Sequence, residues 1–70
     1  MDMSESRKNV LKFIKAFIKE NGYSPTVREI GAGVDLYSSS TVHRHLECLK
    51  RDEYITYVEG SPRTIRVLKK

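Results

Sequence analysis

The chain is poor in cysteine, with Cys48 alone among its 70 residues. One thiol cannot form a disulfide within the chain, and no set of cysteines and histidines has the spacing of a zinc site. Disulfides are typical of secreted proteins and rare in the reducing cytoplasm. We therefore expect a cytoplasmic protein that requires no cofactor.

The sequence also lacks a hydrophobic run of the roughly 20 residues that a membrane helix needs. It shows no leading pattern of charged, apolar and small residues like that of a secretory signal. Repeats, low-complexity tracts and linkers are absent as well. Seventy residues are close to the lower limit for a core without disulfides or metals. We predict a single domain over residues 1–70 and no membrane partner.

Recognisable catalytic motifs are missing too. Without a glycine-rich phosphate loop, nucleotide hydrolysis is not expected. Cys48 and His45 are three residues apart, but nothing supplies an oxyanion site or a third orienting group. On a helix, His43 would diverge from His45, so at most two ligands would meet at one metal ion. We predict no enzyme activity and no metal site.

Positive charge is what the sequence has in excess. Thirteen lysines and arginines stand against nine acidic residues, which gives a net charge of +4 and a sequence pI near 9.4. Residues 37–70 carry seven basic and four acidic groups, against six and five in residues 1–36. Many small proteins share such a balance, but it favours a polyanionic partner, with the basic bias toward the second half.

The first helix is predicted over residues 4–21. Ser4 suits the N-cap, and Gly22 after Asn21 supplies the left-handed residue that commonly ends a helix. Six apolar residues recur at helical spacing: Val10, Leu11, Phe13, Ile14, Phe17 and Ile18. Lysines occupy the opposite side: Lys8, Lys12, Lys15 and Lys19. We interpret them as a solvated face rather than a phosphate site.

A second, short helix is predicted from the pair Thr26 and Glu29. Their spacing is that of a capping box, in which each side chain accepts a hydrogen bond from the other residue's backbone N–H. Gly31 and Gly33 each cost about 1 kcal/mol relative to alanine, so the helix should be brief. Asp35 lies where the chain must turn toward the next element.

The third helix is predicted at about residues 39–51, with Ser38 as its N-cap. Val42, Leu46 and Leu49 follow one another at spacings of four and three residues, which gives a single apolar seam. The polar residues of the first turn lie off this seam, at the end of the helix where unpaired N–H groups point outward.

Two β-rich stretches, 54–58 and 64–68, flank a Gly-Ser-Pro-Arg tip and predict a hairpin. Ile55 and Tyr57 share one face of their strand, as do Ile65 and Val67, so one side of the hairpin should cover the helices while the other stays in solvent. Three helices followed by a two-stranded antiparallel wing describe a mainly α fold, the winged helix-turn-helix.

In such a fold the third helix is presented outward and fits the major groove of double-stranded DNA. Sequence-specific DNA binding is therefore the leading prediction, with Arg63 on the hairpin tip able to enter a minor groove or meet a phosphate. Serine and threonine clusters are also ordinary features of helix starts. A winged-helix module that binds another protein remains the alternative, and non-specific coating of nucleic acid is a third hypothesis.

Three strings, "GYSPTVREIG", "SSSTVHRHLECL" and "GSPRTIRVL", resemble the N-terminal DNA-binding domain of the LexA family of SOS-response repressors, particularly its Gram-positive form. The resemblance runs from about residue 3 to residue 68. It implies a transcriptional repressor domain that docks its third helix on an inverted-repeat, palindromic operator, with two protomers per site. In isolation the domain should be a monomer or a weak dimer.

The resemblance also implies roles for individual residues. The positions that would contact bases are Ser39, Ser40, Thr41, His43 and Arg44. Contacts to DNA phosphates are expected from Arg28, Ser38 and Arg51. Ser61 and Arg63 correspond to the wing.

Some positions depart from the family pattern. Glycine is usual where this chain has Asp35 and Glu53, and such positions tend to need a positive φ, which strains glutamate more than aspartate. Arg44 replaces a smaller or acidic residue, which suggests an altered operator preference. The family's self-cleaving Ser/Lys peptidase domain has no counterpart in these 70 residues.

Overall fold

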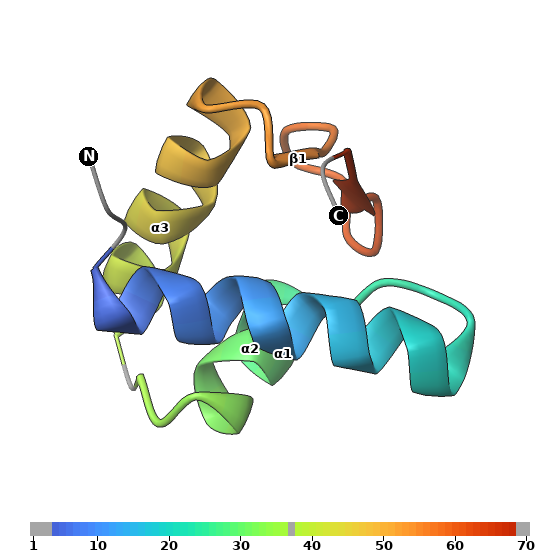
Figure 1. Ribbon diagram of the computed structural model, residues 1–70, viewed down its shortest axis with the longest axis horizontal. Helices are drawn as coiled ribbons and strands as arrows, with labels where there is room; N and C mark the ends of the chain where they lie inside the picture. Colours follow the sequence, from blue (N-terminus) through green and yellow to red (C-terminus); the bar gives the residue numbers. More distant parts are fainter. Residues whose placement is uncertain (1–3, 37, 69–70) are drawn as a thin grey trace.

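Three helices and a small hairpin make up the computed structural model, which describes residues 4–36 and 38–68 (Figure 1). In chain order the elements are α1 (Glu5–Asn21), α2 (Val27–Gly33), α3 (Ser39–Arg51), β1 (Ile55–Thr56) and β2 (Arg66–Val67). The strands are antiparallel, with Ile55 opposite Val67. The predicted fold class is confirmed, although both strands are shorter than the stretches 54–58 and 64–68.

Both ends of α1 are capped as predicted. The Ser4 side chain accepts a hydrogen bond from the backbone N–H of Arg7 at 3.2 Å. At the other end, Gly22 has φ of 80° and donates its N–H to the carbonyl of Ile18 at 2.8 Å. A residue without a Cβ takes this left-handed conformation at little cost, so the helix ends there.

The capping box at the start of α2 is also confirmed. The Glu29 N–H donates to the Thr26 hydroxyl at 3.2 Å, and the Thr26 N–H donates to Glu29 Oε1 at 2.9 Å. The structure adds a reason for Gly33 that the sequence did not give. A Cβ on this residue would collide with the ring of Phe13, so glycine lets α2 approach α1 closely.

The start of α3 differs in detail from the prediction. Ser38 takes the N-cap position, but its side chain makes no capping hydrogen bond. The apolar seam is confirmed, since Val42, Leu46 and Leu49 are all buried. Because the side chains of the seam pack inward, the polar side of α3 is turned to solvent.

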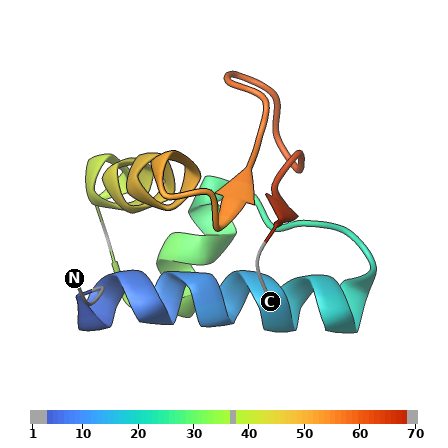
Figure 2. The ribbon, with the colours of Figure 1, turned by 45° about the horizontal axis from the view of Figure 1, so that its top comes forward.

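The core lies where α3 crosses the other elements. Figure 2 shows α1 passing beneath α2 and α3, with the hairpin standing beside them over the later part of α1. The buried apolar side chains are Val10, Leu11, Ile14, Ile30, Val42, Leu46, Leu49, Ile55 and Ile65. Tyr57 and Val67 pack against them, so the predicted inner face of the hairpin is confirmed. Within the two described ranges, no helix is long and apolar enough to cross a membrane.

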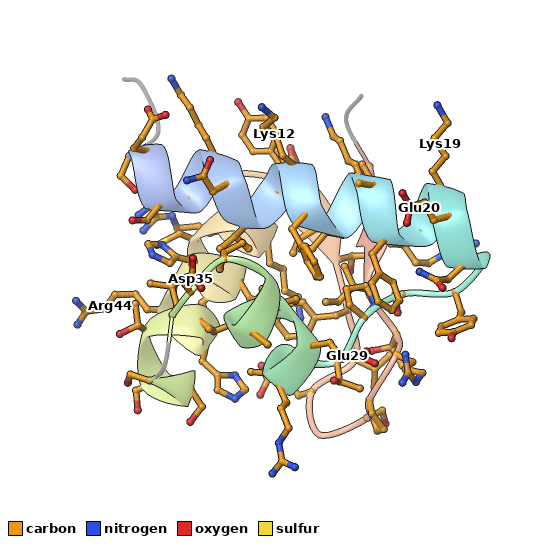
Figure 3. The ribbon with its side chains drawn as sticks, turned by 90° about the horizontal axis from the view of Figure 1, so that it is seen from below. Lys12, Lys19, Glu20, Glu29, Asp35 and Arg44 are labelled. Carbon is orange, nitrogen blue, oxygen red and sulfur yellow. The ribbon has the colours of Figure 1, made fainter. Side chains whose placement is uncertain are left out.

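The lysines predicted to form a solvated face of α1 are all exposed. Lys12 and Lys19 point away from the other helices in Figure 3, and both are exposed. This arrangement agrees with the interpretation of a solvated face.

Asp35 and Glu53 both adopt positive φ, at 58° and 65°. Each lies just after the C-cap of a helix and precedes a residue whose N–H donates a hydrogen bond to a carbonyl of that helix. Leu36 donates to the carbonyl of Gly31 at 2.8 Å, and Tyr54 donates to that of Leu49 at 2.9 Å. This bond from the second residue past the cap is the Schellman arrangement, in which the left-handed position usually holds glycine.

Glycine at these positions should stabilise the protein. We expect Glu53→Gly to raise the free energy of unfolding by about 0.5–1 kcal/mol, because the left-handed conformation no longer strains a Cβ. Asp35→Gly should gain less, since aspartate tolerates this conformation better. Urea denaturation measures both. The matched control is Glu59→Gly, an exposed glutamate whose φ is not positive, and an equal gain there would contradict the explanation.

His45 is a polar residue in the wall of the core. It is 9% exposed, and its Nδ1 finds no hydrogen-bond partner among the described residues. Burial, and then the positive charges of Arg7 and Arg44, lower the pKa of His45 below its ordinary value of 6.5. The folded protein therefore holds this imidazole neutral at neutral pH.

Stability should depend on this imidazole in mildly acidic solution. As pH falls through about 6.5, the unfolded chain takes up a proton that the folded chain resists, so the free energy of unfolding should decrease. We expect His45→Gln to flatten this dependence in urea titrations at pH 7.5 and 5.5. His43→Gln, which changes an exposed histidine two residues earlier, should leave the dependence in place. If His43→Gln flattened the pH dependence and His45→Gln did not, the assignment to His45 would be wrong.

Candidate nucleic-acid interface

The outward side of α3 carries a line of exposed polar residues. The buried seam fixes the rotation of the helix, and positions four, three and four residues apart then follow one another along the opposite side. We call these residues the outer stripe: Ser40, Arg44, Glu47 and Arg51, all exposed. Figure 3 shows Arg44 extending away from the rest of the molecule.

The other residues predicted to contact bases lie beside this stripe. Ser39 and His43 are exposed on the side of α3 that faces α2. With Arg28 of α2 they line a hollow between the two helices. Thr41 is half-buried, so it is the least accessible of the five. Four of the five residues predicted to contact bases are therefore exposed, and one is half-buried.

A second hollow joins three separate parts of the chain. Arg28 from α2, His43 from α3 and Ser61 from the hairpin tip line it together, although the first and the last are 33 positions apart in the chain. The rest of its wall comes from neighbouring residues of the same three elements: Thr26, Val27, Leu46, Tyr57, Val58, Glu59, Gly60 and Pro62. The start of α2, the middle of α3 and the wing therefore form one concave surface.

Two of the residues expected at phosphates bracket α3. Ser38 lies at its N-cap and Arg51 at its last position, so they are about 20 Å apart along the helix axis. Both are exposed. Arg51 Nε lies 3.4 Å from a carboxylate oxygen of Asp52, an exposed pair of a kind that contributes little to stability. Its guanidinium can leave this partner at small cost.

Arg63 is held differently from the way the sequence suggested. Its Nη1 donates to Glu29 Oε1 at 3.0 Å and to the carbonyl of Ser24 at 3.1 Å, while Nη2 donates to Glu29 Oε2 at 3.2 Å. The guanidinium also lies over the ring of Tyr23, 4.8 Å from its centroid. The side chain thus folds back onto α2 and the preceding loop, instead of extending from the tip.

The negative partner in this contact is well defined. The backbone N–H of Thr26 and the guanidinium of Arg63 both hold the pKa of Glu29 below its ordinary value of 4.5. Glu29 is therefore ionised at neutral pH, and it neutralises the charge of Arg63.

Sequence reasoning missed two features of this surface. Glu47 lies on the outer stripe between Arg44 and Arg51, and its spacing from Arg44 could have revealed it. A carboxylate there is able to accept a hydrogen bond from a cytosine amino group. The second feature is the pair of Glu29 and Arg63, which are 34 residues apart and carry no local signal.

The histidines and the cysteine of α3 do not converge. His45 is buried and Cys48 is half-buried, whereas His43 is exposed on another side. Across residues 4–36 and 38–68, no three side chains of histidine, cysteine, aspartate or glutamate are grouped to hold a metal ion.

The sequence is similar to members of one protein family. The family model described as the LexA DNA binding domain matches residues 1–64. A LexA repressor of Desulfitobacterium hafniense is 46% identical over 67 residues, covering 96% of this chain and 33% of that protein. LexA repressors of Bacillus mycoides (46% identical) and Carboxydothermus hydrogenoformans (42% identical) each align over 66 residues, 94% of this chain and 32% of the relative.

The chain spans about one third of the length of these relatives. The region in which the resemblance places a self-cleaving peptidase has no counterpart in the 70 residues. What these residues do contain is matched almost completely, from the capped first helix to the wing. The chain therefore belongs to the LexA DNA-binding domain family.

Proposed function

We propose that this chain recognises a specific sequence in double-stranded DNA and acts as a LexA-like transcriptional repressor domain of the SOS type. In this proposal α3 lies in the major groove with its first half against the bases. The observation that carries the proposal is the concave surface shared by α2, α3 and the wing, which borders the exposed outer stripe of α3. A helix presented in this way fits a groove about 12 Å wide.

The chemistry of the outer stripe supports reading of base edges. Ser40 is short and lets the helix backbone come close, whereas Arg44, one turn later, reaches further. An arginine donates two parallel hydrogen bonds to O6 and N7 of guanine, the commonest specific contact in the major groove. His43 reaches from the side of α2, and Ser39 and Thr41 complete the first turn.

Backbone contacts would fix the position of the helix in the groove. Ser38 and Arg51 mark the two ends of α3, and Arg28 lines the same hollow as His43. Contacts of this kind set register and add affinity without sequence preference. The net charge of +4 strengthens them for any duplex.

One domain of this size would read one half of an operator. We propose that two protomers occupy a palindromic site, since the symmetry of such operators mirrors that of the bound protein pair. Each domain alone should bind weakly, because no second contact raises its effective concentration at the site.

Arg44 and Arg51 should respond differently to substitution. We expect Arg44→Ala to cost about 1–3 kcal/mol on a duplex selected from a random pool and to relax preference at one base pair. Arg51→Ala should weaken selected and random duplexes equally and reduce the salt slope by about 0.9. Fluorescence anisotropy at several salt concentrations measures both.

Lys12→Ala provides the matched control for these arginines. It also removes one positive charge, but from the opposite side of α1 (Figure 3). The affinity of Lys12→Ala for the selected and the random duplex should match that of the wild type. If all three variants lost affinity equally on both duplexes, the surface would bind only through net charge and the assigned roles would be wrong.

Amide NMR provides a direct map of the bound surface. On addition of the selected duplex, we expect the largest shifts at residues 39–44, with smaller ones at Arg28 and Ser61. Lys12 and Lys19 should change little. Shifts confined to α1 would mean that the duplex does not contact α3, and the proposed placement would be wrong. Binding that hardly responds to salt would instead favour the protein-interaction module, because phosphate contacts release counterions.

A further inference from the structure

The wing has few hydrogen bonds that fix its place. β1 and β2 are two residues long, and a two-stranded hairpin of this kind is marginal by itself. Beyond the strands, Thr64 Oγ1 accepts from the N–H of Val58 at 2.9 Å and donates to the carbonyl of Ser61 at 3.0 Å. These bonds shape the loop internally. They do not determine where its tip lies relative to α2 and α3.

Two basic side chains tie the wing to the helices. Near the strands, Lys50 Nζ of α3 donates to the carbonyl of Tyr57 at 3.1 Å. Near the tip, Arg63 reaches Glu29 and Ser24 through three hydrogen bonds from its two terminal nitrogens. Of these two contacts, that of Arg63 lies closer to the tip in the chain.

The partner of Arg63 is itself held in place. Glu29 Oε1 accepts from the Thr26 N–H, so the first turn of α2 fixes the carboxylate. Both carboxylate oxygens then face the guanidinium, at 3.0 and 3.2 Å. A two-point contact of this geometry fixes orientation as well as distance. The wing is thereby aligned with the helix that forms the opposite wall of the concave surface.

The same contacts make Arg63 a poor ligand for phosphate. Both hydrogens of Nη1 are directed to protein acceptors, and Glu29 offsets the positive charge. The ring of Tyr23 covers one part of the guanidinium plane. To reach DNA, Arg63 would have to give up all of these contacts.

We propose that Arg63 is a positioning residue, which together with Glu29 holds the wing tip beside α3, and that it neither binds phosphate nor enters a minor groove. The proposal rests on the DNA-binding function put forward above and assigns a different task to one of its expected contacts. Ser61, which lines the concave surface, would then depend on Arg63 for its placement.

Two substitutions that preserve shape test this role. Glu29→Gln keeps the capping box, because glutamine also accepts the Thr26 N–H, but it removes the negative charge. We expect Glu29→Gln and Arg63→Gln each to weaken binding to the selected duplex by roughly fivefold to tenfold. The double variant should be no weaker than either single one, and the salt slope should equal that of the wild type. Arg66→Gln, which removes an exposed charge from β2, is the control.

A phosphate contact predicts the opposite pattern. Arg63→Gln would reduce the salt slope by about 0.9. Glu29→Gln would strengthen binding, since it releases Arg63 and removes a negative charge near the DNA. Either result would overturn the proposal.

A measurement without DNA separates this proposal from the function on which it rests. The heteronuclear NOE of the Gly60 and Ser61 amides reports fast motion of the wing tip. It should fall in Glu29→Gln and Arg63→Gln and stay unchanged in Arg66→Gln. Unchanged values in all three variants would refute the positioning role, even if the wild type binds a specific duplex. A wild type without sequence preference would refute only the proposed function.

Discussion

Burial of three side chains of α3 determines what the rest of the surface presents. Val42, Leu46 and Leu49 are at most 2% exposed and meet the buried residues of α1, α2 and the hairpin. Burying a side chain of this size contributes about 1.5–3 kcal/mol, whereas an exposed ion pair contributes about 0–1 kcal/mol. The apolar seam therefore sets the rotation of α3. Ser40, Arg44 and the rest of the outer stripe face solvent as a consequence.

The parts of the fold that could be predicted are those with local signals. Ser4 and Gly22 mark the ends of α1, and Thr26 with Glu29 marks the start of α2, each through bonds that span four residues or fewer. The predicted strands are too long, because a β-rich composition does not show which partner each backbone group will bond to. Val58 lies in the first predicted strand, yet its N–H donates to the Thr64 hydroxyl rather than to a strand carbonyl.

The contact between Glu29 and Arg63 shows why the candidate site could be predicted only in part. The capping box at the start of α2 already explains Glu29, so nothing in the sequence predicts that it also pairs with a distant arginine. Arg63 lies 34 residues away on a tip where exposed arginines have no fixed neighbour. Helical periodicity locates Ser40 and Arg44, because their positions depend only on the rotation of α3. It cannot locate a contact that depends on how the hairpin packs against α2.

The shortest helix, α2, contacts both other helices and the wing. Seven residues are too few for a stable helix in isolation, so α2 depends on its neighbours. Ile30 is buried with the side chains of α3, Gly33 lies under the ring of Phe13, and Glu29 meets the wing. Gly33 costs about 1 kcal/mol of helix propensity relative to alanine, but an alanine Cβ would collide with Phe13. Gly33, one of the two glycines that weaken α2 as an isolated helix, thus also lets it pack closely against α1. With α2 held there, Arg28 and Glu29 have fixed positions beside α3 and the wing.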